Sequence, residues 1–537
     1  MMRFAARCAV IVMGGMLCVP AGAATPSATH HRAHHVKPLK LQVAKLLADP
    51  TVSRSHWGIA VTKMDGTSVY ALNAGQFFHP ASNAKLFTTA AAVALLGPEA
   101  TVTTRVTAMS LPNKDGVLPL GGLRLMGAGD SNLSGRTIPY VPPALRVNPA
   151  PQEADPLRYL EEMADQVAKT GLKVVEGDVV GDDSLFPWQP YPEDWSIDDA
   201  VWGYGAPVSA LTVNDNEMKV TVAPAAEAGA PATVAIEQAV PYYTMESSVT
   251  TTAANTIPAV GIDRALGSKV VRVYGTVPVA MQPLTSHLAI DDPAEYAAMA
   301  FKQMLEQRGI RVTGKARAEH RLSVDTANFV DEAQQPLTIP QTAKSVQAGC
   351  TNFCTMLAEH ISPRLIDDIV ATNKVSQNLH AELMLRRLGK AFADDGSAVQ
   401  GARVVRTFLT TLAGIDKDDF VFFDGSGLSG HDLVAPRATV QLLQYASTQP
   451  WFADWKSSLP VSGVDGTLAG RFTRAPLRGH VFAKTGTLGE ARALSGYLEC
   501  ASGRTVIFSI MVDNHAPHSH ADEVVMDRIV AAIAATN

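Results

Sequence analysis

The chain has 537 residues, which at roughly 150 residues per domain allows about three to four domains. Apolar residues make up 47% and charged residues 18% of the sequence, a composition typical of a folded globular protein that excludes disorder as its main feature. The 45 basic and 51 acidic residues give a net charge of -6 without a long basic run. We therefore expect no nucleic-acid partner.

Residues 1–23 have the composition of a secretory signal peptide. Arg3 and Arg7 precede an apolar run, and small residues at 21–23 offer a cleavage site. No later stretch approaches the roughly 20 apolar residues of a membrane-spanning helix. The pattern predicts a periplasmic or otherwise exported protein that is soluble after cleavage and has no transmembrane anchor.

Residues 24–40 are expected to form a linker. Its histidines between positions 30 and 35 have a spacing that suits a metal ion, but no cysteine or carboxylate joins them, which favours a solvated segment. Three cysteines follow, at positions 350, 354 and 500. An odd number forbids complete pairing, and both a disulfide between Cys350 and Cys354 and three buried thiols stay open.

Two apolar hairpins near opposite ends of the chain are predicted to share one antiparallel sheet. The first spans 57–73 around Asp65-Gly66, and the second spans 493–514. Residues 101–216 mix strand and helix patterns as an α/β insertion does, whereas 218–279 has short Val-, Ala- and Thr-rich runs typical of a small all-β module. Helical patterns cover 82–96, 155–169, 292–308, 381–392 and 521–535.

Ser82-Asn83-Ala84-Lys85 is the only Ser-x-x-Lys sequence in the chain, at the start of an apolar helix. Residues three apart on a helix share a face, so the hydroxyl of Ser82 and the amine of Lys85 can meet. A serine is a weak nucleophile until a base takes its proton. A lysine can be that base if burial or a nearby cation lowers its pKa.

Ser376-Gln377-Asn378 precedes another helical stretch. A second hydroxyl and a carboxamide at alternate positions suit a proton relay and a hydrogen bond to a substrate amide. Taken alone, the motif is more typical of a helix cap at Ser376.

Lys-Thr-Gly occurs twice, and the first copy, at 169–171, ends a helix. The second copy is Lys484-Thr485-Gly486, on an apolar strand. On that strand Lys484 and Gly486 face one way, while Thr485 and Thr487 face the other. Such an edge suits a carboxylate and an extended peptide laid beside it.

The three motifs in this order form the signature of penicillin-binding proteins and class A β-lactamases, with Gln377 where that signature has Asp. The sequence resembles D-alanyl-D-alanine carboxypeptidases and DD-endopeptidases of the penicillin-binding-protein-4 type, the low-molecular-mass class C penicillin-binding proteins. Lys85 and Ser376 are 291 positions apart, as in that family, which inserts two domains there. Further matching segments lie at 127–133 (GAGDSNL), 181–186 (GDDSLF), 204–216 (YGAPVSALTVNDN), 358–365 (AEHISPRL), 424–429 (DGSGLS) and 458–468 (SLPVSGVDGTL).

The resemblance implies an α/β multi-domain fold, in which a DD-peptidase/β-lactamase-like domain with an antiparallel sheet flanked by helices carries two insertions. The expected peptidase domain comprises 41–100 and 288–537. The expected α/β domain comprises 101–217 and 280–287, and the small all-β domain is 218–279.

The resemblance also implies the roles of the motif residues. Ser82 attacks the penultimate D-Ala carbonyl, and Lys85 accepts its proton. Ser376 passes a proton to the leaving amine, Asn378 holds the substrate amide, and Lys484 supports the proton network.

For the terminal carboxylate, the resemblance implies binding by Lys484 with Thr485 and Thr487 beside Gly486. The oxyanion hole is expected from the backbone N–H groups of Ser82 and Thr487. No metal or organic cofactor is implied. Peptidoglycan stem peptides are the expected substrates, and β-lactam antibiotics are the expected covalent inhibitors.

An acidic residue of the inserted domain recognises the free amine of the peptide side chain in this family, and Asp182 or Asp183 is the candidate here. Turn chemistry at the end of a strand explains these two residues equally well. Three other functions stay open: a serine β-lactamase, an esterase or amidase acting on D-amino acids, and a non-catalytic cell-wall binding protein.

Overall fold

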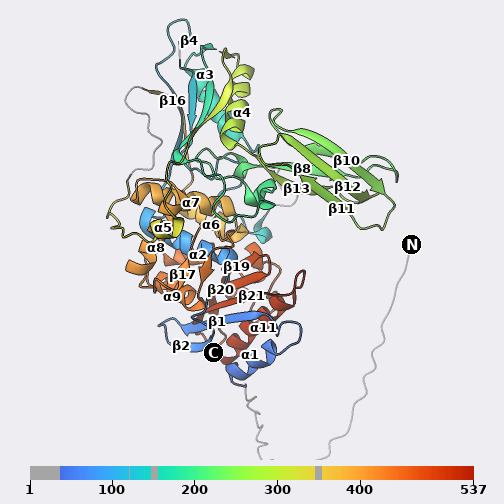
Figure 1. Ribbon diagram of the computed structural model, residues 1–537, viewed down its shortest axis with the longest axis vertical. Coiled ribbons are helices and arrows are strands. Elements are labelled where there is room, and N and C mark those ends of the chain that lie inside the picture. The colour runs from blue at the N-terminus through green and yellow to red at the C-terminus, as the bar shows by residue number, and fades with distance from the viewer. Residues whose placement is uncertain (1–36, 120, 147–154, 345–353) are drawn as a thin grey trace, which may run out of the picture. The chain divides into compact units, whose positions relative to one another are not determined.

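Strands from both ends of the described chain pair in one five-stranded antiparallel sheet (Figure 1). The computed structural model describes residues 37–119, 121–146, 155–344 and 354–537. In sheet order the strands are β19 (Val481–Leu488), β20 (Ala491–Glu499), β21 (Thr505–Asp513), β1 (His56–Lys63) and β2 (Ser68–Leu72). β1 pairs with β21 along its whole length. The prediction that the two hairpins share one sheet is confirmed.

Successive side chains of a strand point to opposite faces of the sheet, and helices cover both faces of this one. On one face, Ile59 and Val61 of β1 pack in a cluster with α1 (Leu39–Leu47) and α11 (Ala521–Thr536). On the other face, Ala60 joins a second cluster. The helices of that cluster are α2 (Ala84–Leu96), α6 (Leu365–Val375), α7 (Asn378–Phe392), α8 (Ala398–Thr411), α9 (Pro436–Ser447) and α10 (Phe452–Ser458).

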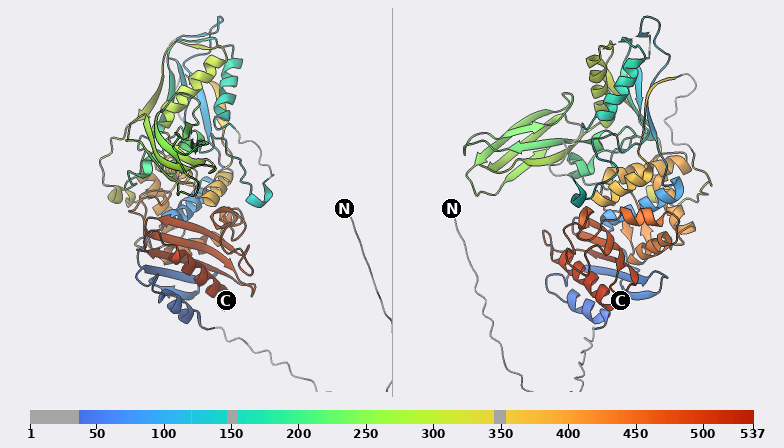
Figure 2. Two further views of the ribbon diagram at one scale, coloured as in Figure 1. Left: turned by 90° about the vertical axis from the view of Figure 1, so that its right-hand side faces the viewer. Right: turned by 180° about the vertical axis from the view of Figure 1, so that it is seen from behind.

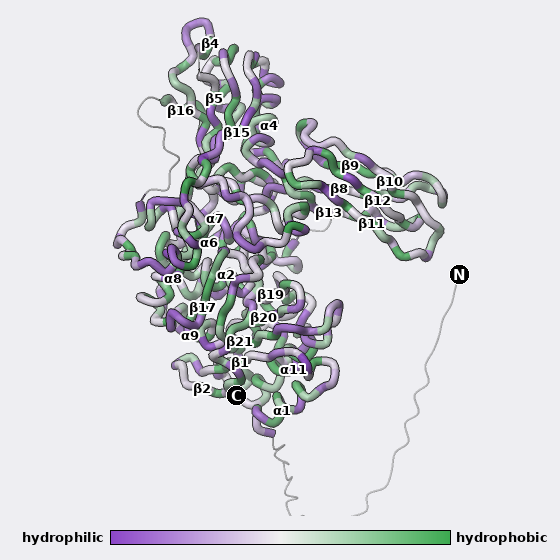
Figure 3. The backbone as a smooth tube through the Cα atoms, viewed as in Figure 1, coloured by the Kyte–Doolittle hydropathy of each residue, from purple (hydrophilic) through white to green (hydrophobic). Residues whose placement is uncertain are grey.

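The helix α2 is the most hydrophobic of these elements along its length, as Figure 3 shows. Every residue from Ala84 to Val93 is buried. Lys85 lies in this buried part of the helix, so its amine, which is cationic in water, is in the protein interior. We call the sheet and these helices the core domain, comprising residues 38–102 and 362–537.

A second mixed sheet forms the α/β insertion, and α3 (Arg158–Lys169) and α4 (Pro293–Gln307) lie side by side against it (Figure 2). Its order is β15 (Ala316–Arg321), β7 (Val179–Pro187), β5 (Leu123–Met126), β3 (Thr103–Ala108) and β16 (Thr355–Ile361). A small parallel sheet contains β4 (Val117–Leu118), β6 (Val174–Val175) and β14 (Arg311–Val312). The expected α/β insertion is present.

The predicted boundary at residue 288 is wrong. β15 pairs with β7, and β16 pairs with β3, so the chain returns to the core domain only after Ile361. The partners of β15 and β16 are far apart from them in the sequence, so the local sequence of each strand does not show which sheet it joins. Only the pairing itself assigns them to the insertion.

The all-β module consists of two three-stranded sheets. One contains β10 (Thr244–Thr252), β12 (Val270–Pro278) and β11 (Ala259–Asp263), and the other contains β13 (Leu284–Ala289), β8 (Glu217–Ala223) and β9 (Thr233–Ile236). Because β13 pairs with β8, residues 284–289 belong to this module and not to the α/β insertion, as 280–287 were expected to do.

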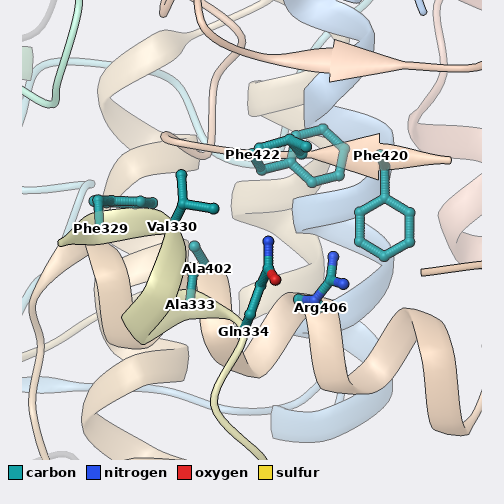
Figure 4. Close-up of a pocket in the computed structure, with 9 residues that line it drawn as sticks. Phe329, Val330, Ala333, Gln334, Ala402, Arg406, Phe420 and Phe422 are labelled. Carbon is teal, nitrogen blue, oxygen red and sulfur yellow. The ribbon is translucent and has the colours of Figure 1, made fainter. Parts of the chain in front are cut away.

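A short helix that follows β15 packs on the core domain. This helix, α5 (Phe329–Ala333), contacts α8, and Phe329 stacks on Phe423 at 4.8 Å. Figure 4 shows the small cavity beneath it, about 20 Å³ in volume, lined by Phe329, Arg406 and Phe420 among others. None of the three motifs lines this cavity, so it belongs to the packing of α5 on the core domain.

Several predictions from the sequence fall on residues that the structure does not describe, namely the signal peptide 1–23, the histidines at 30–35, and Cys350. Cys354 is disulfide-bonded, to a partner outside the described residues, while Cys500 is a buried free thiol. Within the described ranges, no helix has the length and apolar character that crossing a membrane requires.

The central strands of the core sheet join segments from both ends of the described chain. We therefore expect buried side chains on these strands to contribute strongly to the free energy of unfolding. We expect Phe508→Ala on β21, where Phe508 is fully buried, to lower the free energy of unfolding by about 3–5 kcal/mol, because it removes buried apolar area and leaves a cavity. The measurement is the shift of the calorimetric unfolding midpoint of the core domain. Val524→Ala on α11, where the side chain is 48% exposed, is the control. A shift no larger than the control's contradicts the prediction.

Candidate active site

The Ser-x-x-Lys motif lies where a short 3-10 helix, η1 (Ala81–Asn83), runs into α2. The preceding residue, Ala81, has a φ of 45°, a left-handed conformation that costs free energy for a residue with a side chain. Lys85 lies in the first turn of α2, and its Nζ donates to Ser82 Oγ at 3.0 Å. The predicted contact between serine and lysine is confirmed.

Lys85 is fully buried, and its ammonium group is held by acceptors from distant parts of the chain. Its Nζ donates to Asn378 Oδ1 at 2.6 Å and to the carbonyl oxygen of Ser426 at 2.7 Å. Burial lowers the pKa of Lys85 to about 8, although the nearby carboxyl groups of Asp424 and Glu382 oppose the shift. An amine with this pKa can accept the proton of Ser82 near neutral pH.

The Ser-x-Asn motif forms the junction between α6 and α7. Ser376 ends α6 with φ 61° and ψ 40°, and Gln377 caps α7 by accepting from Leu379 N–H at 3.2 Å. The capping role that the sequence allowed for Ser376 thus belongs to Gln377. Ser376 is left with its hydroxyl directed at Lys484, whose Nζ donates to Ser376 Oγ at 2.8 Å.

The Lys-Thr-Gly motif lies on β19, at the edge of the core sheet. Lys484 is fully buried, and burial, followed by the charge of Lys85, holds its pKa well below the usual value. Thr485 and Thr487 face the other way, and the hydroxyl of Thr485 lies 2.8 Å from that of Thr467. The alternation expected along this strand is present.

Gly486 is required by the close approach of β19 to the nucleophile. A Cβ atom built at this position would lie 2.7 Å from the carbonyl oxygen of Pro80 and 3.1 Å from the backbone nitrogen of Ser82. Any side chain would therefore push the strand away from Ser82. The backbone of β19 also fixes Asn83, whose Nδ2 donates to the carbonyl oxygen of Lys484 at 3.1 Å.

The DGSGLS segment holds Lys85 from the side opposite Ser82, a role that the sequence analysis did not assign. Asp424 is buried and accepts from the backbone N–H groups of Ser426, Gly427, Leu428 and Ser429, at 2.6 to 3.0 Å. Its carboxylate thus fixes the loop that presents the Ser426 carbonyl to Lys85. An Asp before a run of Gly and Ser is the signal that predicts such a turn.

Two more buried acids lie behind this loop. Burial and the charge of Asp424 raise the pKa of Glu382 to about 8, and the same two causes raise the pKa of Asp432 well above its usual value. Glu382 also accepts from the Gly425 N–H group at 2.9 Å. Neighbouring carboxyl groups in a low dielectric cannot all ionise. Asp424, Glu382 and Asp432 together therefore carry fewer than three negative charges opposite the charge of Lys85.

A buried ion network joins the α/β insertion to the start of α7. His380 lies between Asp368 Oδ1 at 2.6 Å and Asp215 Oδ1 at 3.1 Å, and Asp215 also pairs with Arg136. Gln377 Nε2 donates to Asp215 Oδ2 at 3.2 Å. Through this network, a carboxylate of the insertion positions the middle residue of the Ser-x-Asn motif.

The network keeps its histidine charged. Burial lowers the pKa of His380, but the charges of Asp368 and Asp215 outweigh it and raise that pKa to about 9. None of these residues was predicted to form a network, because Asp215 lies in a segment that was noted only for the family resemblance. A histidine two positions after Asn378 was the available signal.

Asp182 and Asp183 form ion pairs within the α/β insertion, and the prediction that one of them recognises a substrate amine stays a prediction. Asp182 pairs with Arg124 at 2.7 Å within the α/β sheet. Asp183 contacts His320 at 2.9 Å and accepts from Ser209 at 2.9 Å. Both residues are buried, and neither lines the pocket beside Ser376. Their carboxylates stabilise the insertion.

A pocket of about 400 Å³ opens beside the Ser-x-Asn motif. Its wall includes Tyr204, whose carbonyl oxygen accepts from Asn378 Nδ2 at 2.8 Å and whose hydroxyl donates to Asp199 at 2.8 Å. The other wall comes from the all-β module. The Ser-x-Asn motif therefore lines a pocket that both insertions help to form.

Comparison with known proteins agrees with this geometry. Residues 39–535 match the model of the D-Ala-D-Ala carboxypeptidase 3 (S13) family. The chain belongs to this family. As an S13 member with Ser82 and Lys85 in contact, it is a serine DD-peptidase of peptidoglycan metabolism.

Individual relatives also support the assignment of the chain to the S13 family. It is 32% identical to a D-alanyl-D-alanine carboxypeptidase of Actinomadura sp. (strain R39), over 99% of this chain and 90% of the relative. It is 25% identical to the D-alanyl-D-alanine carboxypeptidase DacB of Haemophilus influenzae, over 66% and 69% of the two chains. The crystal structure of penicillin-binding protein 4 (dacB) from Haemophilus influenzae has the same fold, with a TM-score of 0.74 at 22% identity over 92% and 98% of the chains.

The lowered pKa of Lys85 predicts the pH dependence of the S13 enzyme. We expect kcat/KM for release of D-Ala from a D-Ala-D-Ala peptide to rise with pH and to level off above about pH 8, as Lys85 becomes the free amine. Lys85→Ala should lower kcat/KM by about 10²- to 10⁴-fold at the plateau. Lys417→Ala, at an exposed lysine, is the control, and a flat wild-type profile through this pH range would rule out Lys85 as the base.

The raised pKa of His380 predicts how stability depends on pH. Because its folded-state pKa of about 9 lies above the ordinary value of 6.5, its contribution is complete below about pH 6.5 and is lost as pH rises through about 9. We expect the thermal unfolding midpoint of the wild type to fall across this window. His380→Gln should show a lower midpoint and a flatter profile there, while His431→Gln, at an exposed histidine, should follow the wild type. Parallel profiles for His380→Gln and the wild type would contradict the assignment.

Proposed function

We propose that the enzyme cleaves the bond after the penultimate D-Ala of peptidoglycan stem peptides through an acyl-enzyme on Ser82. The observation that carries this proposal is the contact between Ser82 Oγ and Lys85 Nζ at 3.0 Å, with the pKa of Lys85 near 8. Lys85 accepts the hydroxyl proton as Ser82 attacks the carbonyl carbon. The positive charge this creates on Lys85 is held by Asn378, Ser426 and the acid group behind them.

Ser376 and Lys484 carry the proton onward. Ser376 Oγ accepts a hydrogen bond from Lys484 Nζ at 2.8 Å, so its own proton is directed toward the site and passes to the amine that leaves. The proton that Lys85 took from Ser82 then replaces it on Ser376. Asn378 supplies a carboxamide between Lys85 and the substrate amide. The contacts of Lys85 with Ser82 and of Lys484 with Ser376 are already made before substrate binds.

The edge of β19 binds the peptide. Thr485 and Thr487 lie on the face of β19 opposite Lys484 and are less buried than it, and their hydroxyls suit the terminal carboxylate. The N–H groups of Ser82 and Thr487 form the oxyanion hole. A Cβ atom at Gly486 would lie 3.1 Å from the Ser82 nitrogen, so the backbone of β19 is close enough to Ser82 for both N–H groups to donate to one oxyanion. Each such donor contributes about 2.7–4 kcal/mol in acyl transfer.

Water then hydrolyses the acyl-enzyme, and the released peptide ends in the former penultimate D-Ala. The same carbonyl is the target whether the leaving group is a terminal D-Ala or the amine of a cross-link. β-Lactams acylate Ser82 and inhibit the enzyme. The Haemophilus influenzae penicillin-binding protein 4 structure has also been solved in complex with a β-lactam, which supports this part of the proposal.

The site of action is the periplasm or another compartment outside the cytoplasm. Support comes from the sequence of residues 1–23, with two arginines ahead of an apolar run and small residues at the predicted cleavage site. A peptidoglycan substrate requires the same location.

Intact-mass spectrometry with excess benzylpenicillin tests the nucleophile. We expect the wild type to gain the mass of one drug molecule and to keep it over hours, and Ser82→Ala to gain none, because the ester to Ser82 is the only covalent link. Ser502→Ala, at an exposed serine of the β20–β21 hairpin, should behave like the wild type. Rapid consumption of the drug without an adduct would instead identify a β-lactamase, and intact drug without an adduct would reject Ser82 as an acylated nucleophile.

A further inference from the structure

The pocket beside Ser376 has walls from three parts of the chain. Val375 and Ser376 belong to the core domain, Trp202 belongs to the α/β insertion, and Ser286 and His287 lie on β13 of the all-β module. Its volume of about 400 Å³ falls in the range of about 300–1,000 Å³ that is usual for binding sites of drug-sized ligands. That is far more than the methyl and carboxylate groups of one D-Ala occupy.

We infer that this pocket is the subsite for the leaving group when that group is the second peptide of a cross-link. The inference rests on the proposed function, in which Ser376 passes a proton to the leaving amine. Whatever is attached to that nitrogen lies next to Ser376, and Ser376 together with Val375 forms one wall of the pocket. A single D-Ala ends beside the β19 edge, whereas a peptide extends across the pocket to β13.

The pocket offers the groups that such a peptide needs. Glu217 Oε1 lies 2.6 Å from His287 Nδ1, and this hydrogen bond raises the pKa of His287. The His287 side chain is 54% exposed and lines the pocket, so its ring can form a hydrogen bond with a polar group of the leaving peptide. Trp202 adds apolar surface for the methylene groups of a diamino acid.

Glu217 keeps this position because of Gly203. A Cβ atom at position 203 would lie 2.0 Å from Glu217 Oε2, so a side chain there would displace the carboxylate that holds His287. The short helix that contains this glycine, η4 (Gly203–Gly205), contacts both β13 and α7. Within it, the carbonyl oxygen of Tyr204 accepts from Asn378 Nδ2 at 2.8 Å. The pocket is therefore built onto the Ser-x-Asn motif, and the all-β module serves as a specificity element of the active site.

Two substrates with the same acyl donor separate leaving-group binding from the rest of the reaction. One is a stem peptide ending in D-Ala-D-Ala, and the other is the same peptide cross-linked through its D-Ala to the diamino acid of a second peptide. Both form the same acyl-enzyme, so a difference in kcat/KM reports the leaving group alone. The rate of acylation by benzylpenicillin is measured in parallel as the readout of the proposed function.

Ser286→Trp fills the pocket. Its control, Ser247→Trp, adds the same side chain at an exposed position of β10 in the same module, outside the pocket lining. We expect Ser286→Trp to lower kcat/KM for the cross-linked peptide about tenfold or more, with the D-Ala-D-Ala peptide and benzylpenicillin within about twofold of the wild type. Ser247→Trp should leave all three rates unchanged.

His287→Ala checks the same pocket with a smaller perturbation. It should raise KM for the cross-linked peptide about three- to tenfold, with little change for the D-Ala-D-Ala peptide. Unchanged cleavage of the cross-link in both pocket variants, or equal losses on all three substrates, overturns the inference. A greater loss on longer acyl-donor stems than on larger leaving groups also overturns it, because the pocket would then bind the other side of the substrate. A wild type that neither forms the penicillin adduct nor cleaves either peptide rejects the proposed function instead.

Discussion

Two lysine side chains are buried side by side at the place where the three motifs meet, and the rest of the site is arranged around them. Burying an ammonium group is costly unless hydrogen bonds and opposite charges compensate. Lys85 has Ser82, Asn378 and the Ser426 carbonyl as acceptors, and Lys484 has Ser376. The part of this cost that is not compensated lowers the pKa values of both lysines. Their amines can therefore exchange protons instead of staying permanently charged.

The acids behind the DGSGLS loop set how far this lowering goes. Asp424 stabilises the charged form of Lys85, while Glu382 and Asp432 have raised pKa values because they share one buried region with Asp424. Without such acids, burial would lower the pKa of Lys85 further, because their charges oppose the effect of desolvation. The pKa near 8 is thus a balance between desolvation and a partly neutralised acid group.

The insertions are bound to this centre by polar contacts at several places. Asp215 reaches the start of α7 through His380 and Gln377, Trp195 Nε1 donates to Asp424 at 2.9 Å, and Tyr204 accepts from Asn378. These contacts end on the Ser-x-Asn motif, on His380 in the helix that follows it, or on Asp424, which fixes the loop that contacts Lys85. A displacement of either insertion would therefore move catalytic groups. Substrate recognition and the geometry of the base are therefore coupled in one hydrogen-bonded structure.

Local sequence determined the elements and the chemistry: the hairpins, the helix after Ser82 and the alternation at Lys484-Thr485-Gly486 depend on neighbours within one or two turns, and all were predicted. Tertiary structure decided what depends on distant partners. β15 and β16 were assigned to the wrong domain because strand pairing, not local pattern, places them. Asp183 looked available in sequence, yet folding gives its carboxylate to His320 and Ser209. The acceptors of Lys85 and the charge on His380 likewise arise only when segments hundreds of residues apart exclude water together.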